Sequence, residues 1–84
     1  MNRKIGTEWT LIEEVGTGGT FTIQPLYEDI SYAVSASKPE ESEEGGIIPK
    51  KKQLIFQKVD EDLYLKDYNG LGSSKVYIGE IKGW

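Results

Sequence analysis

Apolar residues alternate with polar residues along most of this chain, and this period of two constrains the fold more than any other feature. The alternation recurs in six segments: TEWTLIE (7–13), TFTIQ (20–24), ISYAVSAS (30–37), QLIFQ (53–57), DLYLK (62–66) and KVYIGEI (75–81). They are rich in Thr, Val, Ile, Tyr and Phe, which favour a half-buried pleated surface. No window has the apolar spacing of a helix, and ten glycines disfavour one. The sequence therefore predicts an all-β chain.

Turn residues separate these segments. Glycines cluster at 16–19, a polar stretch occupies 37–46, and DYNGLGSS occupies 67–74. Short strands joined by such turns are typical of a small antiparallel β-sandwich or barrel. We expect about six to seven strands in a single domain spanning residues 1–84, with an N-terminal arm at 1–6 and a flexible acidic loop at 37–47.

The chain contains neither cysteine nor histidine. Disulfide bonds and thiolate metal sites are therefore excluded, and the commonest general base at neutral pH is missing. A carboxylate pair such as Asp67 with Glu80 is the alternative that remains for acid–base chemistry. We expect a protein that is not an enzyme and that holds no cofactor or metal.

The formal net charge is −4, which does not favour binding to nucleic acid or to an anionic membrane. No apolar run reaches the length of about 18 residues that a membrane-spanning helix needs. The basic residues near the N-terminus are not followed by the apolar run of a secretory signal. We expect synthesis in the cytoplasm without a signal peptide, and no nucleic-acid or membrane partner.

Three glycines lie in the four positions from Gly16 to Gly19, a density also found in phosphate-binding loops. Those loops continue into a helix whose N-terminal amides face the phosphate, and a P-loop also needs a lysine. Here Thr20, Phe21 and Thr22 continue in strand alternation instead. We interpret the glycines as a turn between strands, where positive φ angles are needed.

Two charged runs allow more than one interpretation. KPEESEEGG (38–46) has four glutamates in five positions, which suits calcium, but it lacks the EF-hand spacing and is interpreted as a solvated loop. Lys50–Lys52 form a basic run of the kind that binds nucleic acid, but it leads directly into a strand without interleaved aromatic residues. We interpret it as a charged strand entry that protects a sheet edge. It could also face the acidic loop of the same chain or of a neighbouring copy.

Alternation divides the apolar residues between two sides of the predicted sheets. The residues assigned to the core are Trp9, Leu11, Phe21, Ile23, Tyr32, Val34, Leu54, Phe56, Leu63, Leu65, Val76 and Ile78. Those left on the outer side are Ile12, Ile55, Tyr64, Tyr77 and Ile81. Because isolated domains rarely expose a contiguous apolar patch above a few hundred Å², we predict that these five are subunit contacts. The alternative is a two-sided core with a β-bulge near Gly79.

Two aromatic residues are not readily assigned to a core, Tyr68 in DYNG and Trp84. An aromatic ring with an exposed face can stack against a ligand. Tyr68 and Trp84 are therefore candidate stacking residues of a carbohydrate site, with Asp67 and Asn69 supplying hydrogen bonds.

The order of the segments resembles the small β-sandwich structural proteins of tailed bacteriophages, which serve as capsid decoration, fibre or tail components. In that family a strand ending in glutamine precedes a Y-x-V strand, a glycine and an aliphatic residue lead into a basic or proline turn, and an L-Y-x-K strand lies near the end. The matching positions are Gln24, Tyr32, Val34, Gly46, Ile48, Leu63, Tyr64 and Lys66. Pro25 departs from the pattern, because the family has a small polar residue there.

The resemblance implies a non-enzymatic virion protein that assembles with other virion proteins and with itself, as a homotrimer, and it supplies no catalytic residue. Association would bury apolar strand faces, at about 25 cal/mol per Å². Two alternatives stay open. One is a carbohydrate-binding module, and the other is a domain that binds another protein by adding a strand at an open sheet edge.

Overall fold

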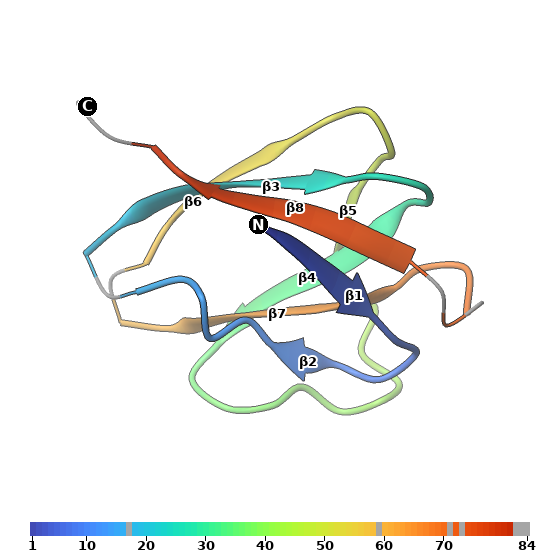
Figure 1. The fold of residues 1–84 in the computed structure, drawn as a ribbon. Coiled ribbons are helices and arrows are strands. Elements are labelled where there is room, and N and C mark those ends of the chain that lie inside the picture. The colour runs from blue at the N-terminus through green and yellow to red at the C-terminus, as the bar shows by residue number, and fades with distance from the viewer. Residues whose placement is uncertain (17, 59, 71, 73, 82–84) are drawn as a thin grey trace.

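The computed structural model describes residues 1–16, 18–58, 60–70, 72 and 74–81. Within these residues the chain forms eight strands and no helix, so none of its described elements is a helix able to cross a membrane (Figure 1). The strands are β1 (Asn2–Ile5), β2 (Thr10–Leu11), β3 (Thr20–Pro25), β4 (Ile30–Ser35), β5 (Gly46–Ile48), β6 (Leu54–Gln57), β7 (Asp62–Asp67) and β8 (Ser74–Glu80).

The strands form two antiparallel sheets that pack face to face, which confirms the predicted all-β sandwich. The first sheet has the order β1-β8-β3-β6 and the second has the order β2-β7-β4-β5. In Figure 1, β3 and β8 lie above β4 and β7. Among the described strands only β4 and β5 follow one another within a sheet, so the other connections pass from one sheet to the other. This crossing ties both sheets together along the whole chain.

Two strands lie outside the six predicted segments. Residues 2–5, expected to be an arm, pair with β8 as an edge strand in which Ile5 is fully buried. Gly46–Ile48, expected within the flexible loop, pair with β4, and Ile48 is buried. Each strand has a single buried apolar residue, so neither segment shows enough alternation to be recognised in the sequence.

The core lies between the two sheets. Its buried residues are Ile5, Ile12, Val15, Phe21, Ile23, Ile30, Ile48, Leu63, Leu65, Val76 and Ile78, with Tyr32, Leu54 and Phe56 packed against them. Most of the predicted core residues are in this set, but Val34 is wrong because it is 44% exposed. Val34 is in register with Leu63 near the end of β4, where it lines a small pocket with Phe56. It therefore lies at the open end of the sandwich.

Strand β2 has the opposite sidedness from the prediction. Leu11 is in register with Tyr64, and the Ile12 N–H donates a 3.0 Å hydrogen bond to the Leu63 carbonyl. Ile12 is consequently a core residue, 1% exposed, and its prediction as a subunit contact is wrong. Because Leu11 and Ile12 are both apolar, the sequence of this short strand does not decide which of them faces the core. A shift of one residue in the register moves every side chain of a strand to the other face.

A loop, residues 36–45, covers the outer side of the second sheet. The Trp9 Nε1–H donates to the Glu40 carbonyl at 3.1 Å, and the Lys66 ammonium donates to the Glu41 carbonyl at 2.9 Å. Gly45 has a φ of 65°, and a Cβ there would collide with the Tyr32 carbonyl, so glycine is required where the chain turns into β5. The acidic loop thus folds back along the protein and does not reach outward (Figure 1).

This loop also explains why Tyr64, the second residue wrongly predicted as a subunit contact, is buried. Tyr64 points to the outer side of β7, as alternation predicts, but it is only 7% exposed. Trp9, predicted for the core, is 3% exposed and lies 4.6 Å from the Lys66 ammonium, measured to the ring centre. Trp9 and Tyr64 on the outer side of the second sheet are therefore buried within one chain, and Tyr64 is not available as a subunit contact.

Candidate functional site

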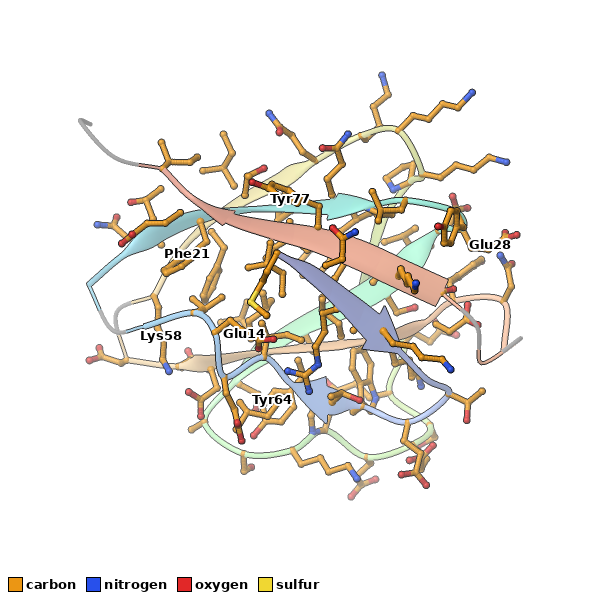
Figure 2. The ribbon with its side chains drawn as sticks, viewed as in Figure 1. Glu14, Phe21, Glu28, Lys58, Tyr64 and Tyr77 are labelled. Carbon is orange, nitrogen blue, oxygen red and sulfur yellow. The ribbon has the colours of Figure 1, made fainter. Side chains whose placement is uncertain are left out.

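The outer side of the first sheet carries no such cover in the described part of the chain. We call the outer side of β8, β3 and β6 the open face; its side chains are Thr20, Thr22, Gln24, Ile55, Gln57, Lys75 and Tyr77. Exposure alternates along β6 and β8, with Ile55 47% exposed and Tyr77 40% exposed. Figure 2 shows Tyr77 on this upper side and Tyr64 on the opposite side of the sandwich.

Three strands contribute to one row across the open face. Gly79 of β8 is in register with Thr22 of β3, and Thr22 is in register with Ile55 of β6. The Tyr77 ring lies over Gly79, because its Cε2 and hydroxyl oxygen are 2.8 and 2.9 Å from where a Cβ of residue 79 would be. The tyrosine ring, Thr22 and Ile55 therefore form a strip at right angles to the strands.

The register of β8 with β3 bears on the other predictions for this face. The pairing runs without interruption from Phe21–Glu80 to Pro25–Val76, so the alternative β-bulge near Gly79 is wrong. Ile81 follows β8, is partly buried, and its N–H donates to the Thr20 carbonyl at 2.8 Å. The structure thus brings Ile55, Tyr77 and Ile81 to the first sheet. Nothing in the sequence distinguishes Thr22 from the other polar residues of its strand, and the only signal at Gly79 is a glycine within a strand pattern.

A pocket of about 300 Å³ lies on the outer side of the second sheet. Its floor is a row across three strands, Lys66, Ser31 and Ile47, which are in register. The acidic loop forms one side, and Tyr68, 52% exposed, lines the pocket just after β7. The glutamates that line the pocket, Glu41, Glu43 and Glu44, make no salt bridge with a described residue. The pocket therefore combines an exposed aromatic ring with a negative wall.

The residues predicted to assist Tyr68 are already engaged in a turn. The Asp67 carboxylate accepts hydrogen bonds from the Asn69 N–H at 3.1 Å and the Gly72 N–H at 2.7 Å. Asp67 is 3% exposed, and the Asn69 amide donates to Glu28 at 3.1 Å. Asp67 therefore shapes the connection to β8 and is not directed at a ligand. Trp84, the other candidate stacking residue, lies outside the described residues.

The structure does not bring the proposed carboxylate pair together. Asp67 contacts Gly72, just before β8 begins at Ser74, whereas Glu80 is the last residue of that seven-residue strand. An extended strand rises about 3.4 Å per residue, so the two carboxylates lie roughly 20 Å apart. Within the described ranges no group of three or more Asp, Glu, His or Cys is placed to hold a metal ion.

The glycine-rich segment is a turn, as predicted. The Gly19 N–H donates to the Gly16 carbonyl at 3.2 Å, and the Gly18 N–H donates to the Lys58 carbonyl at 2.7 Å. Strand β3 begins directly afterwards at Thr20. These amides are used within the protein, and no helix follows to complete a phosphate site.

Comparisons with known proteins give no relative from which a role could be transferred. The chain matches no family model, no curated protein and no solved structure. The open face and the pocket beside Tyr68 are therefore the observations that bear on function.

Proposed function

We propose that this chain is a non-catalytic structural protein of a bacteriophage virion that assembles through the open face. The observation that carries the proposal is the exposed strip across β8, β3 and β6, in which the Tyr77 ring and Ile55 lie on either side of Thr22. Aromatic residues are enriched in interface cores, where they contribute a large part of the binding energy. The virion location and the homotrimer are supported by the sequence resemblance.

The contrast between the two sheets supports this use of the open face. Trp9 and Tyr64 on the outer side of the second sheet are buried, and the loop at residues 36–45 is bonded to Trp9 and Lys66 there, whereas Ile55 and Tyr77 have no cover in the described chain. Burial of a few hundred Å² of apolar surface contributes several kcal/mol, at about 25 cal/mol per Å², before the entropy cost of association. Repetition of the contact on a symmetric particle makes weak individual contacts sufficient for attachment.

The test is the mass of the protein in solution by light scattering. We expect the wild-type chain to have at least three times the 9.4 kDa mass of the monomer, and Tyr77→Asp to stay folded but form a smaller species. Tyr27→Asp is the matched control, because Tyr27 is 58% exposed and lies between β3 and β4, away from the strip. A Tyr77→Asp protein with the wild-type oligomer mass would contradict the proposal.

The pocket beside Tyr68 favours a second candidate function, carbohydrate binding. Its volume of about 300 Å³ suits one sugar unit, and the exposed ring of Tyr68 offers a stacking surface beside Ser31 and Lys66. We expect hits on a glycan array to disappear with Tyr68→Ala and to persist with Tyr27→Ala. An array without hits for the wild-type chain excludes this candidate.

A further inference from the structure

The Ser31 hydroxyl faces the pocket beside Tyr68 without a hydrogen-bond partner in the described chain. Ile30 packs in the core, so alternation along β4 turns Ser31 to the outer side of the second sheet, where it lines the pocket. Ser31 is only 3% exposed, and no hydrogen bond joins its hydroxyl to another described residue. Buried polar groups normally have a partner, so this hydroxyl indicates a ligand that supplies one.

The charges around this hydroxyl are mostly negative. Glu41, Glu43 and Glu44 line the pocket, and none of their carboxylates forms a salt bridge with a described residue. Lys66 also lines the pocket, but its ammonium is engaged with the Glu41 carbonyl at 2.9 Å and with the Trp9 ring, whose centre is 4.6 Å away. Three carboxylates against one ammonium leave an excess of negative charge, which a cationic ligand would balance.

Tyr68 supplies a surface that favours an organic cation. It lies two positions after Lys66, the residue in register with Ser31, and such diagonal neighbours on a sheet are within reach of an aromatic side chain. Its ring is exposed and lines the pocket. The face of an aromatic ring attracts an ammonium group that lies within about 6 Å of the ring centre.

A metal ion does not suit this arrangement. Its oxygen ligands must converge on one point, and among the residues that the structure describes no three carboxylates are placed to do so. An ammonium group on a carbon skeleton has no such coordination geometry. It can contact spaced carboxylates, a hydroxyl and an aromatic ring together.

We propose that the pocket beside Tyr68 binds a protonated primary amine carried by a small organic molecule. The ammonium group donates to the Ser31 hydroxyl and lies against the Tyr68 ring, while Glu43 and Glu44 balance its charge. A quaternary ammonium is excluded, because it has no N–H to donate to Ser31. Ile47, exposed and in register with Ser31, offers an apolar contact to the carbon skeleton.

This proposal goes beyond the two functions proposed above, since it requires neither a virion nor a sugar ring. An amino sugar and an aliphatic amine both carry the group that the pocket would recognise. The volume of about 300 Å³ has room for either. Separate probes therefore have to distinguish the two sources.

NMR titration with two matched pairs of probes tests the proposal. The pairs are glucosamine with glucose and butylamine with butanol, and within each pair a hydroxyl replaces the ammonium group. The titrations are done slightly below neutral pH, which keeps both amines protonated. We expect at least one amine to bind about tenfold more tightly than its matched alcohol. The amide signals of Ser31, Ile47 and Tyr68 should shift.

Two variants of the pocket and one control locate the binding. Glu43→Gln with Glu44→Gln should weaken amine binding about tenfold and leave alcohol binding unchanged. Ser31→Ala should weaken amine binding about fivefold. The control, Asp60→Asn with Glu61→Gln, makes the same change in net charge at exposed positions before β7, at the opposite end of that strand from Tyr68, and should bind the amines like the wild-type chain.

The proposal is overturned if neither amine binds more tightly than its alcohol, or if either pocket variant binds the amines like the wild-type chain. It is also overturned if the control weakens amine binding as much as Glu43→Gln with Glu44→Gln, because the attraction would then come from net charge alone. The carbohydrate candidate is decided separately by the glycan array. Hits on neutral glycans keep that candidate even when neither amine binds.

Discussion

The indole N–H of Trp9 donates a 3.1 Å hydrogen bond to the backbone carbonyl of Glu40, which fastens the acidic loop to the outer side of the second sheet. The same ring lies beneath the Lys66 ammonium, and Lys66 also donates to the loop at Glu41. One buried tryptophan therefore links β2, β7 and a loop that is 31 residues away from it along the chain.

Trp9→Phe should loosen this loop while the fold is kept. The phenylalanine ring still fills part of the site, but the donor to Glu40 is lost, which costs about 1 kcal/mol of unfolding free energy. We expect faster amide hydrogen exchange at 40–44 and unchanged exchange in β8. Trp9→Ala should cost more, about 3 kcal/mol, because it also leaves a cavity. If amide exchange at residues 40–44 is as slow in Trp9→Phe as in the wild-type chain, the hydrogen bond does not hold the loop in place.

Gly79→Ala should change the open face without unfolding the protein. The new methyl group would meet the Tyr77 ring, whose nearest atoms are the outer part of a side chain that can rotate away. Alanine is also favoured over glycine in a strand by about 0.5 kcal/mol or more. We expect a melting temperature no lower than that of the wild-type chain, together with weaker association by light scattering. Unchanged association would mean that the flat position of the Tyr77 ring is not needed.

Glu14 should make the stability of the protein depend on pH in the acid range. Burial raises the pKa of the Glu14 carboxyl, but hydrogen bonds from Arg3 and the backbone, together with the Arg3 charge, outweigh burial and hold the pKa below its usual value of 4.5. Arg3 Nη1 lies 2.8 Å from both carboxylate oxygens. Because the folded-state pKa is the lower one, this stabilisation is present above pH 4.5 and is lost as the pH falls through the folded-state value.

Melting curves of the wild-type chain and Glu14→Gln check this dependence. At pH 7 we expect Glu14→Gln to melt several degrees lower, since about 1 kcal/mol corresponds to roughly 4–8 °C in a domain of this size. The difference should shrink as the pH falls below 4.5. Glu13→Gln is the neighbouring control, because Glu13 is exposed and outside this ion pair. If the difference in melting temperature between the wild-type chain and Glu14→Gln is the same at pH 7 as below pH 4.5, the ionised Glu14 carboxylate is not the source of the stabilisation.

Asp67→Ala should destabilise the turn before β8. The substitution leaves the N–H groups of Asn69 and Gly72 without their acceptor, at a cost of about 2 kcal/mol for groups this close to the core. Asp67→Asn keeps one acceptor oxygen and should fall between the wild-type chain and Asp67→Ala. Chemical denaturation measures both. Equal stability of all three proteins would show that water replaces the carboxylate without loss.

Ser74→Ala should stabilise the protein. The Ser74 hydroxyl is completely buried at the start of β8 and has no hydrogen-bond partner among the described residues. Removal of an unsatisfied buried hydroxyl relieves a desolvation penalty of about 1 kcal/mol. We expect a higher denaturation midpoint with an unchanged slope, and a lower midpoint would reveal a partner for the hydroxyl.

The alternation of apolar residues was sufficient to predict the all-β sandwich and most of its core, because a period of two is a local property that any half-buried strand must show. Segments such as TFTIQ and DLYLK each contain at least two core residues at alternate positions, and both are strands. β1 and β5 were not predicted, since each buries a single apolar side chain.

Only the tertiary structure decided which apolar residues stay exposed. Ile12 and Tyr64 are hidden, the first by the register of β2 with β7 and the second beneath a loop distant in sequence, whereas Ile55 and Tyr77 remain open. Alternation specifies two sides for every strand, but what covers each side depends on contacts between segments far apart in the chain, and these contacts leave no period in the sequence.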